Sequence, residues 1–188
     1  MEKTMNTAIL KICGQGKNSY RKKQDVRHVI NYVLDETKRE KDDIWNTIGI
    51  FGSTKEDFAE DFHRLKRLYG KTDGLQLKHL MLSWGRRPEM PRKKLRILIK
   101  KTMGFWGENY QLVYAVHEDN LPDGWHMHIV LNSVSVNGHK IQITQKVLTK
   151  FKKKFNGIWN PYGYELCMEQ QRKKTDSDKS FECSITAG

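Results

Sequence analysis

Three histidines that lie close together in the sequence carry its strongest chemical signal. His126 and His128 are separated by one residue, and His117 ends the preceding apolar segment. Side chains two residues apart in a strand project from the same face, so His126 and His128 point in one direction, together with Asn132. Three converging imidazoles suit a divalent metal ion with open positions for a substrate. The alternative is a set of polar histidines without a ligand.

The segments around these histidines predict a β-hairpin. Residues 111–117 and 125–136 are rich in strand-forming residues, and the loop 118–124 between them is short and rich in turn residues. The second strand has an apolar face opposite to its histidines, formed by Trp125, Met127, Ile129 and Leu131. Glu118 and Asp119 directly follow His117. Each either orients an imidazole as a hydrogen-bond acceptor or is a solvated turn carboxylate.

The charge of the chain favours a polyanionic partner. The 188 residues carry a formal net charge of +12, in repeated Lys/Arg clusters that include 21–23 and 86–87. Such clusters bind phosphates, and the five tryptophans offer surfaces for base stacking, although a basic surface without a partner is the alternative. With neither a long apolar run nor a secretory leader, and with scattered cysteines, we expect a cytoplasmic protein without membrane insertion.

The order of the predicted elements indicates an α+β domain with a mainly antiparallel central sheet and helices packed against one face. Residues 1–170 form this domain, and the polar tail 171–188 is predicted to be flexible. The predicted strands cover residues 7–12, 44–51, 77–84, 111–117 and 125–136, and the predicted helices cover residues 24–38, 54–70, 91–105 and 144–157.

A metal site in a basic chain suggests phosphoryl chemistry, and a tyrosine is the candidate nucleophile. The sequence offers no carboxylate cluster for a two-metal nuclease and no Walker loop. Tyr32 lies in the helix 24–38, roughly 130° from the centre of its apolar stripe, so its hydroxyl group can face a cleft. An ordinary surface tyrosine is the simpler interpretation, and Tyr20, in the basic loop, is the main competitor.

Three short motifs in this order resemble those of the MobP-type conjugative relaxases, a group of HUH endonucleases. They are Val29-Ile-Asn-Tyr-Val-Leu-Asp-Glu36, His79-Leu-Met-Leu-Ser-Trp84 and the histidine motif from His117 to Asn132. The likeness covers about residues 7–165. The second motif continues into Gly85-Arg-Arg-Pro-Glu89, which departs from the usual compact turn by extra positive charge. Since many relaxases have further C-terminal domains, the chain corresponds to a minimal relaxase or to one domain of a longer protein.

The resemblance implies a site- and strand-specific DNA nickase that starts the transfer of a plasmid or integrative element. Tyr32 would form a 5′-phosphotyrosine link with origin-of-transfer single-stranded DNA. Because a free tyrosine has a pKa near 10, the metal or an acceptor such as Asp119 must assist its deprotonation. His117, His126 and His128 would hold Mn or Mg, with Zn, Co and Ni as alternatives. The expected partners are this DNA and other mobilisation or coupling proteins. The predicted DNA contacts are Ser83, Arg86, Arg87, Asn132, Lys22 and Lys23.

Two alternatives stay open on the sequence. Another HUH enzyme, either a rolling-circle replication initiator or a single-strand transposase, would have nearly the same site chemistry and would differ in its DNA substrate. A non-catalytic DNA-binding accessory protein would have structural histidines. It would bind no stoichiometric metal and form no covalent adduct with DNA.

Overall fold

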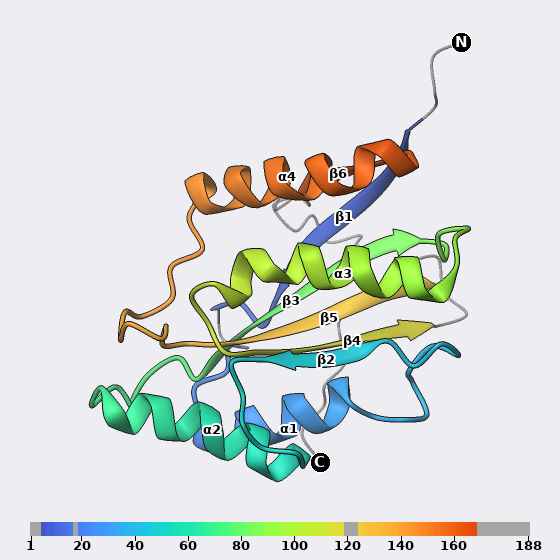
Figure 1. The fold of residues 1–188 in the computed structure, drawn as a ribbon. Coiled ribbons are helices and arrows are strands. Elements are labelled where there is room, and N and C mark those ends of the chain that lie inside the picture. Colours follow the sequence, from blue (N-terminus) through green and yellow to red (C-terminus); the bar gives the residue numbers. More distant parts are fainter. Residues whose placement is uncertain (1–4, 17–18, 119–123, 169–188) are drawn as a thin grey trace, which may run out of the picture.

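A computed structural model describes residues 5–16, 19–118 and 124–168 of the protein. They form a six-stranded sheet in the order β2-β4-β5-β3-β1-β6, with four helices packed on it (Figure 1). The elements in chain order are β1 (Asn6–Cys13), α1 (Lys23–Val33), β2 (Trp45–Ile48), α2 (Lys55–Leu68), β3 (Leu77–Gly85), α3 (Arg92–Gly107), β4 (Leu112–Glu118), β5 (Trp125–Asn132), α4 (Gln145–Trp159), the 3₁₀ turn η2 (Asn160–Tyr162) and β6 (Tyr164–Met168). All neighbouring strands are antiparallel except β1 and β6, which confirms the predicted α+β fold class.

The helices cover both faces of the sheet, so the prediction that they pack against one face is wrong. Figure 1 shows α3 and α4 on one side and α1 and α2 on the other. Every residue of β5 is buried. A strand that is buried on both sides requires a layer of helices over each face.

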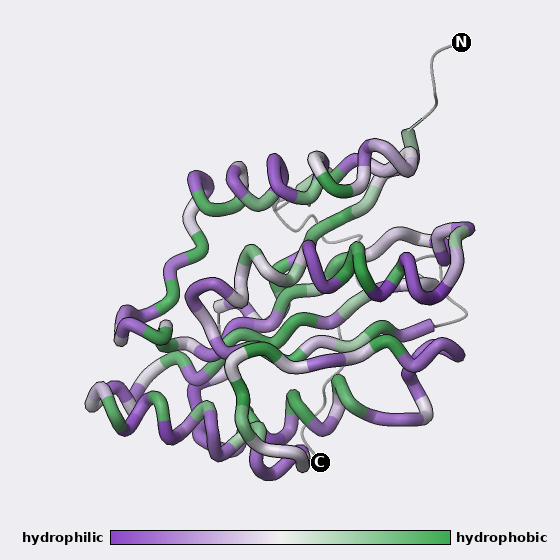
Figure 2. The backbone as a smooth tube through the Cα atoms, in the orientation of Figure 1, coloured by the Kyte–Doolittle hydropathy of each residue, from purple (hydrophilic) through white to green (hydrophobic). Residues whose placement is uncertain are grey.

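The larger core lies under α3 and α4. Figure 2 shows apolar residues concentrated in the central strands, whereas the helices alternate between polar and apolar positions. Trp125, Met127, Ile129 and Leu131 all point into this core, as the strand periodicity predicts. Trp84 packs between Trp125 and Trp159 at ring-centroid distances of 5.1 and 5.0 Å. This packing fixes the parity of β5 and so directs its histidines to the opposite face.

The smaller core joins α1 and α2 to the histidine face of the sheet. The apolar stripe of α1 packs with α2 against β-sheet residues that include Val113, Ala115 and Val130. Helix α1 ends at Val33, earlier than predicted, because the Asp35 carboxylate accepts hydrogen bonds from the backbone and hydroxyl of Thr37 and begins a turn. The C-terminal end of α1 therefore lies over β4 and β5.

The sequence analysis missed β6, a short strand that pairs in parallel with β1 from Asn6↔Tyr164 onward. It follows the last predicted helix, and its five residues show little of the apolar alternation that marks a strand. The predicted tail 171–188 lies outside the described residues. Within the part of the chain that is described, no helix has the length and apolar character needed to cross a bilayer.

Candidate functional site

The three predicted histidines meet on the face of the sheet that α1 covers. His117 of β4 lies directly opposite His126 of β5 in the strand register, and His128 follows on the same side. One ring nitrogen of each imidazole lies within 4.8 Å of those of the other two. All three side chains are buried, with exposed fractions of 1% for His117, 4% for His126 and 1% for His128.

The C-terminal end of α1 holds the His117 ring in one tautomer. His117 Nε2 lies 2.9 Å from the carbonyl oxygen of Val33. A carbonyl oxygen accepts hydrogen bonds and cannot donate them, so Nε2 carries the proton. In a neutral imidazole, Nδ1 is then the nitrogen whose lone pair is available to a metal ion.

A hydrogen-bonded chain of side chains orients His128 from the other side. His128 Nδ1 lies 2.9 Å from His79 Nε2, and His79 Nδ1 lies 3.1 Å from the Tyr20 hydroxyl group. His128 Nε2 faces His126 Nε2 at 3.1 Å. If His128 binds a metal through Nε2, its Nδ1 must carry the proton and donate to His79. His79 then donates through Nδ1 to the Tyr20 oxygen.

Burial keeps two of these histidines uncharged. It lowers the pKa of His79 to about 3, with smaller contributions from His117 and His126. Burial also lowers the pKa of His128 well below its usual value, and the neighbouring imidazoles act in the same direction. Metal ions bind the neutral form of imidazole, and the lowered pKa values keep His79 and His128 in that form at physiological pH.

The donor set fits a divalent metal ion. Two nitrogens bound to one ion at about 2.1 Å are at most about 4.2 Å apart, so a cluster within 4.8 Å needs only small side-chain adjustments. Three protein ligands leave further coordination positions for water or a phosphate oxygen. The hydrogen bonds of His117 to Val33 and of His128 to His79 are the kind of outer contacts that orient metal-binding imidazoles.

Tyr32 lies beside this cluster on the last turn of α1. Its ring packs edge-on against His128 and His117, at centroid distances of 5.3 and 5.7 Å. The Lys38 ammonium group lies over the ring, 4.1 Å from its centroid. The Tyr32 side chain is half-buried, on the flank of the apolar stripe where its helical position places it.

Tyr20, the competing tyrosine, occupies a different position. Its ring contacts His79, with 6.0 Å between centroids, and its hydroxyl group is hydrogen-bonded to the same imidazole. His79 therefore stands between Tyr20 and His128. The geometry pairs Tyr32 with the predicted metal ligands and Tyr20 with the side chain that orients one of them.

Ser83 lies near the end of β3, and Arg86 directly follows the strand. Ser83 is opposite His126 in the register, and its hydroxyl oxygen accepts a hydrogen bond from the Gly85 amide. The Ser83 side chain is buried, whereas Arg86 is exposed. A serine beside His126 followed by an exposed arginine is compatible with DNA at this end of the strand.

Two of the predicted DNA contacts have partners within the protein. The Asn132 side chain is fully buried, and its amide donates to the Phe62 carbonyl and to Gln111, so it ties α2 to the sheet. Arg87 forms an ion pair with Asp42. The strand parity places Asn132 on the histidine face, as predicted, but the helix layer covers it there.

The other described residues of the predicted set lie on the surface. Lys22 and Lys23 are exposed at the start of α1, at the opposite end of the helix from Tyr32. Glu118 is also exposed. Asp119 lies outside the described residues.

His79 is the site residue that the sequence analysis missed. It appears there only as the first letter of a motif, although strand parity places it on the same face of β3 as Ser83, four residues later. That parity is a usable signal. The pairing of β3 with β5, which brings His79 to His128, depends on contacts between distant parts of the chain.

The comparison with protein families identifies the family of the chain. A family model described as relaxase, MobA/VirD2-like, nuclease domain matches residues 32–164, which is more than half of the chain. The match begins at Tyr32 and includes His79, Ser83 and the three clustered histidines. A comparison with curated proteins gave no match. The chain belongs to the MobA/VirD2-like relaxase nuclease family.

Proposed function

We propose that this relaxase cleaves single-stranded origin-of-transfer DNA at one site on one strand, through a covalent 5′-phosphotyrosine link to Tyr32. The nick would initiate the conjugative transfer or mobilisation of a plasmid or integrative element. The family match supports a relaxase nuclease domain that acts on DNA. The nucleophile, the metal dependence and the transfer role are the parts that this proposal adds.

The observation that carries the proposal is the contact of Tyr32 with the histidine cluster. Its ring touches both His117 and His128, whose nitrogens belong to the group that fits a metal ion. A nucleophile must lie beside the group that polarises its target. Among the two tyrosines that the sequence nominates, Tyr32 meets this requirement and Tyr20 is separated from the cluster by His79.

In the proposed reaction the Tyr32 oxygen attacks the scissile phosphorus in line with the bond to the 3′ oxygen of the preceding nucleotide. The new phosphotyrosine bond forms as that bond breaks, and the released 3′ oxygen takes up a proton. A bound divalent ion would polarise the phosphate and offset its developing charge. The phenol proton must leave before or during the attack, and we assign its acceptance to Asp119. The reverse reaction rejoins the strand.

Part of the histidine face offers a place for the DNA strand. Towards β1 and β6 the helices α1 and α2 no longer cover the sheet: Ile9 is 40% exposed, and Lys11 and Met81 are half-buried. An open sheet surface with apolar and cationic side chains suits stacked bases and their phosphates. We propose that the single strand crosses this surface on its way to Tyr32, and that other mobilisation or coupling proteins present the origin.

The experiment tests for a covalent product. The full chain is incubated with Mn²⁺ or Mg²⁺ and with single-stranded oligonucleotides tiled over both strands of the element that encodes it. The proposal predicts a protein–DNA adduct that survives denaturant, from oligonucleotides of one strand around one position. Tyr32→Phe abolishes the adduct and leaves DNA binding largely intact, whereas Tyr20→Phe still forms it.

Other outcomes assign the protein differently. An adduct lost in Tyr20→Phe and kept in Tyr32→Phe would move the nucleophile to Tyr20. DNA binding without an adduct or stoichiometric metal would make the protein a non-catalytic accessory factor. Cleavage confined to a replication origin or a transposon end would place it with the other HUH enzymes.

A further inference from the structure

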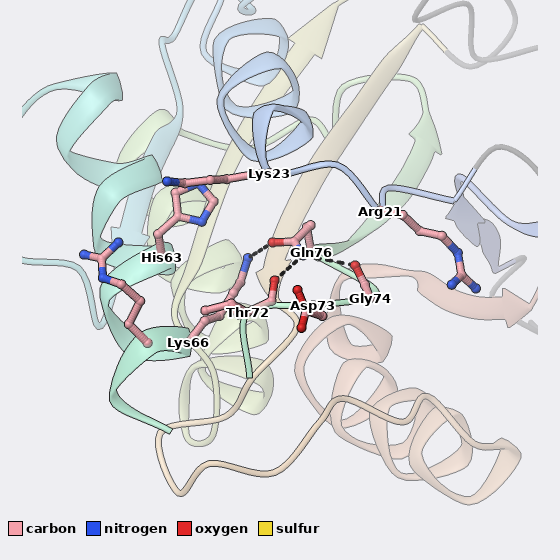
Figure 3. A pocket seen from close by; sticks show the side chains of 9 residues that line it. Arg21, Lys23, His63, Lys66, Thr72, Asp73, Gly74 and Gln76 are labelled. Carbon is pink, nitrogen blue, oxygen red and sulfur yellow. Dashed lines mark hydrogen bonds between the residues drawn. The ribbon is translucent and has the colours of Figure 1, made fainter. Parts of the chain in front are cut away.

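A second candidate site, lined by cationic side chains, lies away from the histidine cluster in a cavity of about 310 Å³. It is bounded by the start of α1, the second half of α2 and the turn that leads into β3 (Figure 3). Cavities of this size accommodate small ligands or single groups of larger ones. The proposed reaction at Tyr32 uses none of the residues that line it.

A buried lysine is the unusual feature of this cavity. The exposed fraction of Lys66 is 1%, and its ammonium group donates to the Gln76 side-chain oxygen at 3.0 Å. Gln76 is fixed in this orientation because its amide nitrogen donates to the carbonyl groups of Thr72 and Gly74. Figure 3 shows the Lys66 amine directed to Gln76 beside this turn. The partner of the buried cation is therefore a neutral amide.

A buried ammonium group without an anionic partner is costly, since burial removes its hydration. Among the described residues, none of the ion pairs involves Lys66. Burial lowers its pKa to about 8, so the group is still mostly charged at neutral pH. It has three N–H donors, and a bound anion would accept from those that Gln76 does not use.

The other lining residues favour an anion as well. Arg21 and Lys23 reach the cavity from the start of α1 and are exposed, whereas Arg67 is partly neutralised by its ion pair with Glu60. Asp73 is the one carboxylate in the lining. The lining therefore has three cationic side chains besides Lys66 and one carboxylate, so the net charge around the cavity is positive.

We propose that this cavity binds a phosphate group, supplied by the backbone of the same single-stranded DNA at a position away from the scissile phosphate. The DNA source rests on the proposed function. Lys23 and Tyr32 are nine residues apart on α1, which corresponds to about 14 Å along the helix. Tyr20 also joins the two sites, because its backbone carbonyl accepts a hydrogen bond from the Gln76 backbone N–H and its hydroxyl group is hydrogen-bonded to His79.

The test compares wild type with Lys66→Met, which keeps the aliphatic stem and removes the charge. Inorganic phosphate should raise the Tm of the wild type by roughly 3 °C at several times its Kd, relative to chloride of equal ionic strength. Lys66→Met should lose this shift while folding at least as well without phosphate. The exposed Lys100 on α3 provides the matched control, and Lys100→Met should keep the shift. Arg21→Gln, an exposed change in the same cavity, should reduce it.

The DNA arm measures how affinity for a single strand depends on salt. Loss of one phosphate contact makes the slope of log K against log salt less negative by about 0.7, and we expect this change in Lys66→Met and not in Lys100→Met. A phosphate shift without a change in slope would overturn the DNA source and leave a site for a free phosphate compound. Equal phosphate shifts in wild type and Lys66→Met would overturn the site itself. The adduct assay on the wild type tests the proposed function separately.

Discussion

His79 offers a sharp test of how the metal site is organised. It is fully buried and joins His128 to Tyr20 through hydrogen bonds of 2.9 and 3.1 Å. The change His79→Leu removes both bonds at similar bulk, so the ring of His128 loses the acceptor that fixes its tautomer. Losing such an outer partner typically weakens metal affinity by about 10–100-fold, or about 1.4–2.7 kcal/mol.

His79→Gln is the matched rescue, because a glutamine carbonyl oxygen can accept from His128 Nδ1 as His79 Nε2 does. Calorimetric titration with Mn²⁺ and Co²⁺ should give weak binding for His79→Leu and nearly wild-type binding for His79→Gln. The exposed His28 supplies a control on α1, and His28→Gln should bind as the wild type does. A folded His79→Leu protein with wild-type metal affinity would refute the orienting role. Circular dichroism establishes that the variant is folded.

Three further predictions concern the metal, the buried lysine and the buried asparagine. Chelation with EDTA should abolish the DNA adduct and lower the Tm, since a metal that binds only the folded state stabilises it. Adding Mn²⁺ should restore both the adduct and the Tm. An adduct that persists without metal would argue against a metal role of the three histidines in the reaction. Because the pKa of Lys66 is about 8 when folded and 10.5 when unfolded, the unfolded chain binds more protons between these values and wild-type stability rises with pH there. The stability advantage of Lys66→Met should therefore shrink from pH 8 to 10.5 in urea titrations, and a constant difference would contradict the lowered pKa. Asn132→Ala should lower the free energy of unfolding by about 2–4 kcal/mol, while the folded variant binds DNA as the wild type does. A loss of DNA affinity in the folded variant would show that Asn132 contacts DNA.

The parity of β5 could be predicted from the sequence because it is a local property. Alternation sends Trp125 and Met127 into one core and His126 and His128 to the other face, and no distant contact is needed to see it. The apolar stripe of α1 is local in the same sense, and it places Tyr32 on the flank of the helix. These two patterns account for most of the candidate site.

The features that the sequence did not reveal depend on pairings between distant segments. His79 meets His128 because β3 lies next to β5, and Arg87 is neutralised by Asp42, which lies 45 residues earlier. Asn132 has the parity of a site residue but lies beneath α2. Whether a polar side chain on that face meets DNA or a helix is decided by how far α1 and α2 extend over the sheet.

The position of the DNA link on the chain tests the central claim most directly. The denatured covalent complex is digested with trypsin and a nuclease, and the peptide that carries the nucleotide remnant is identified by mass spectrometry. Cleavage after Lys and Arg places Tyr32 in the peptide 28–38 and Tyr20 in the peptide 18–21, so the two candidates are separated. We predict a phosphate-linked remnant on Tyr32. A remnant on Tyr20 or on any other side chain would contradict the account.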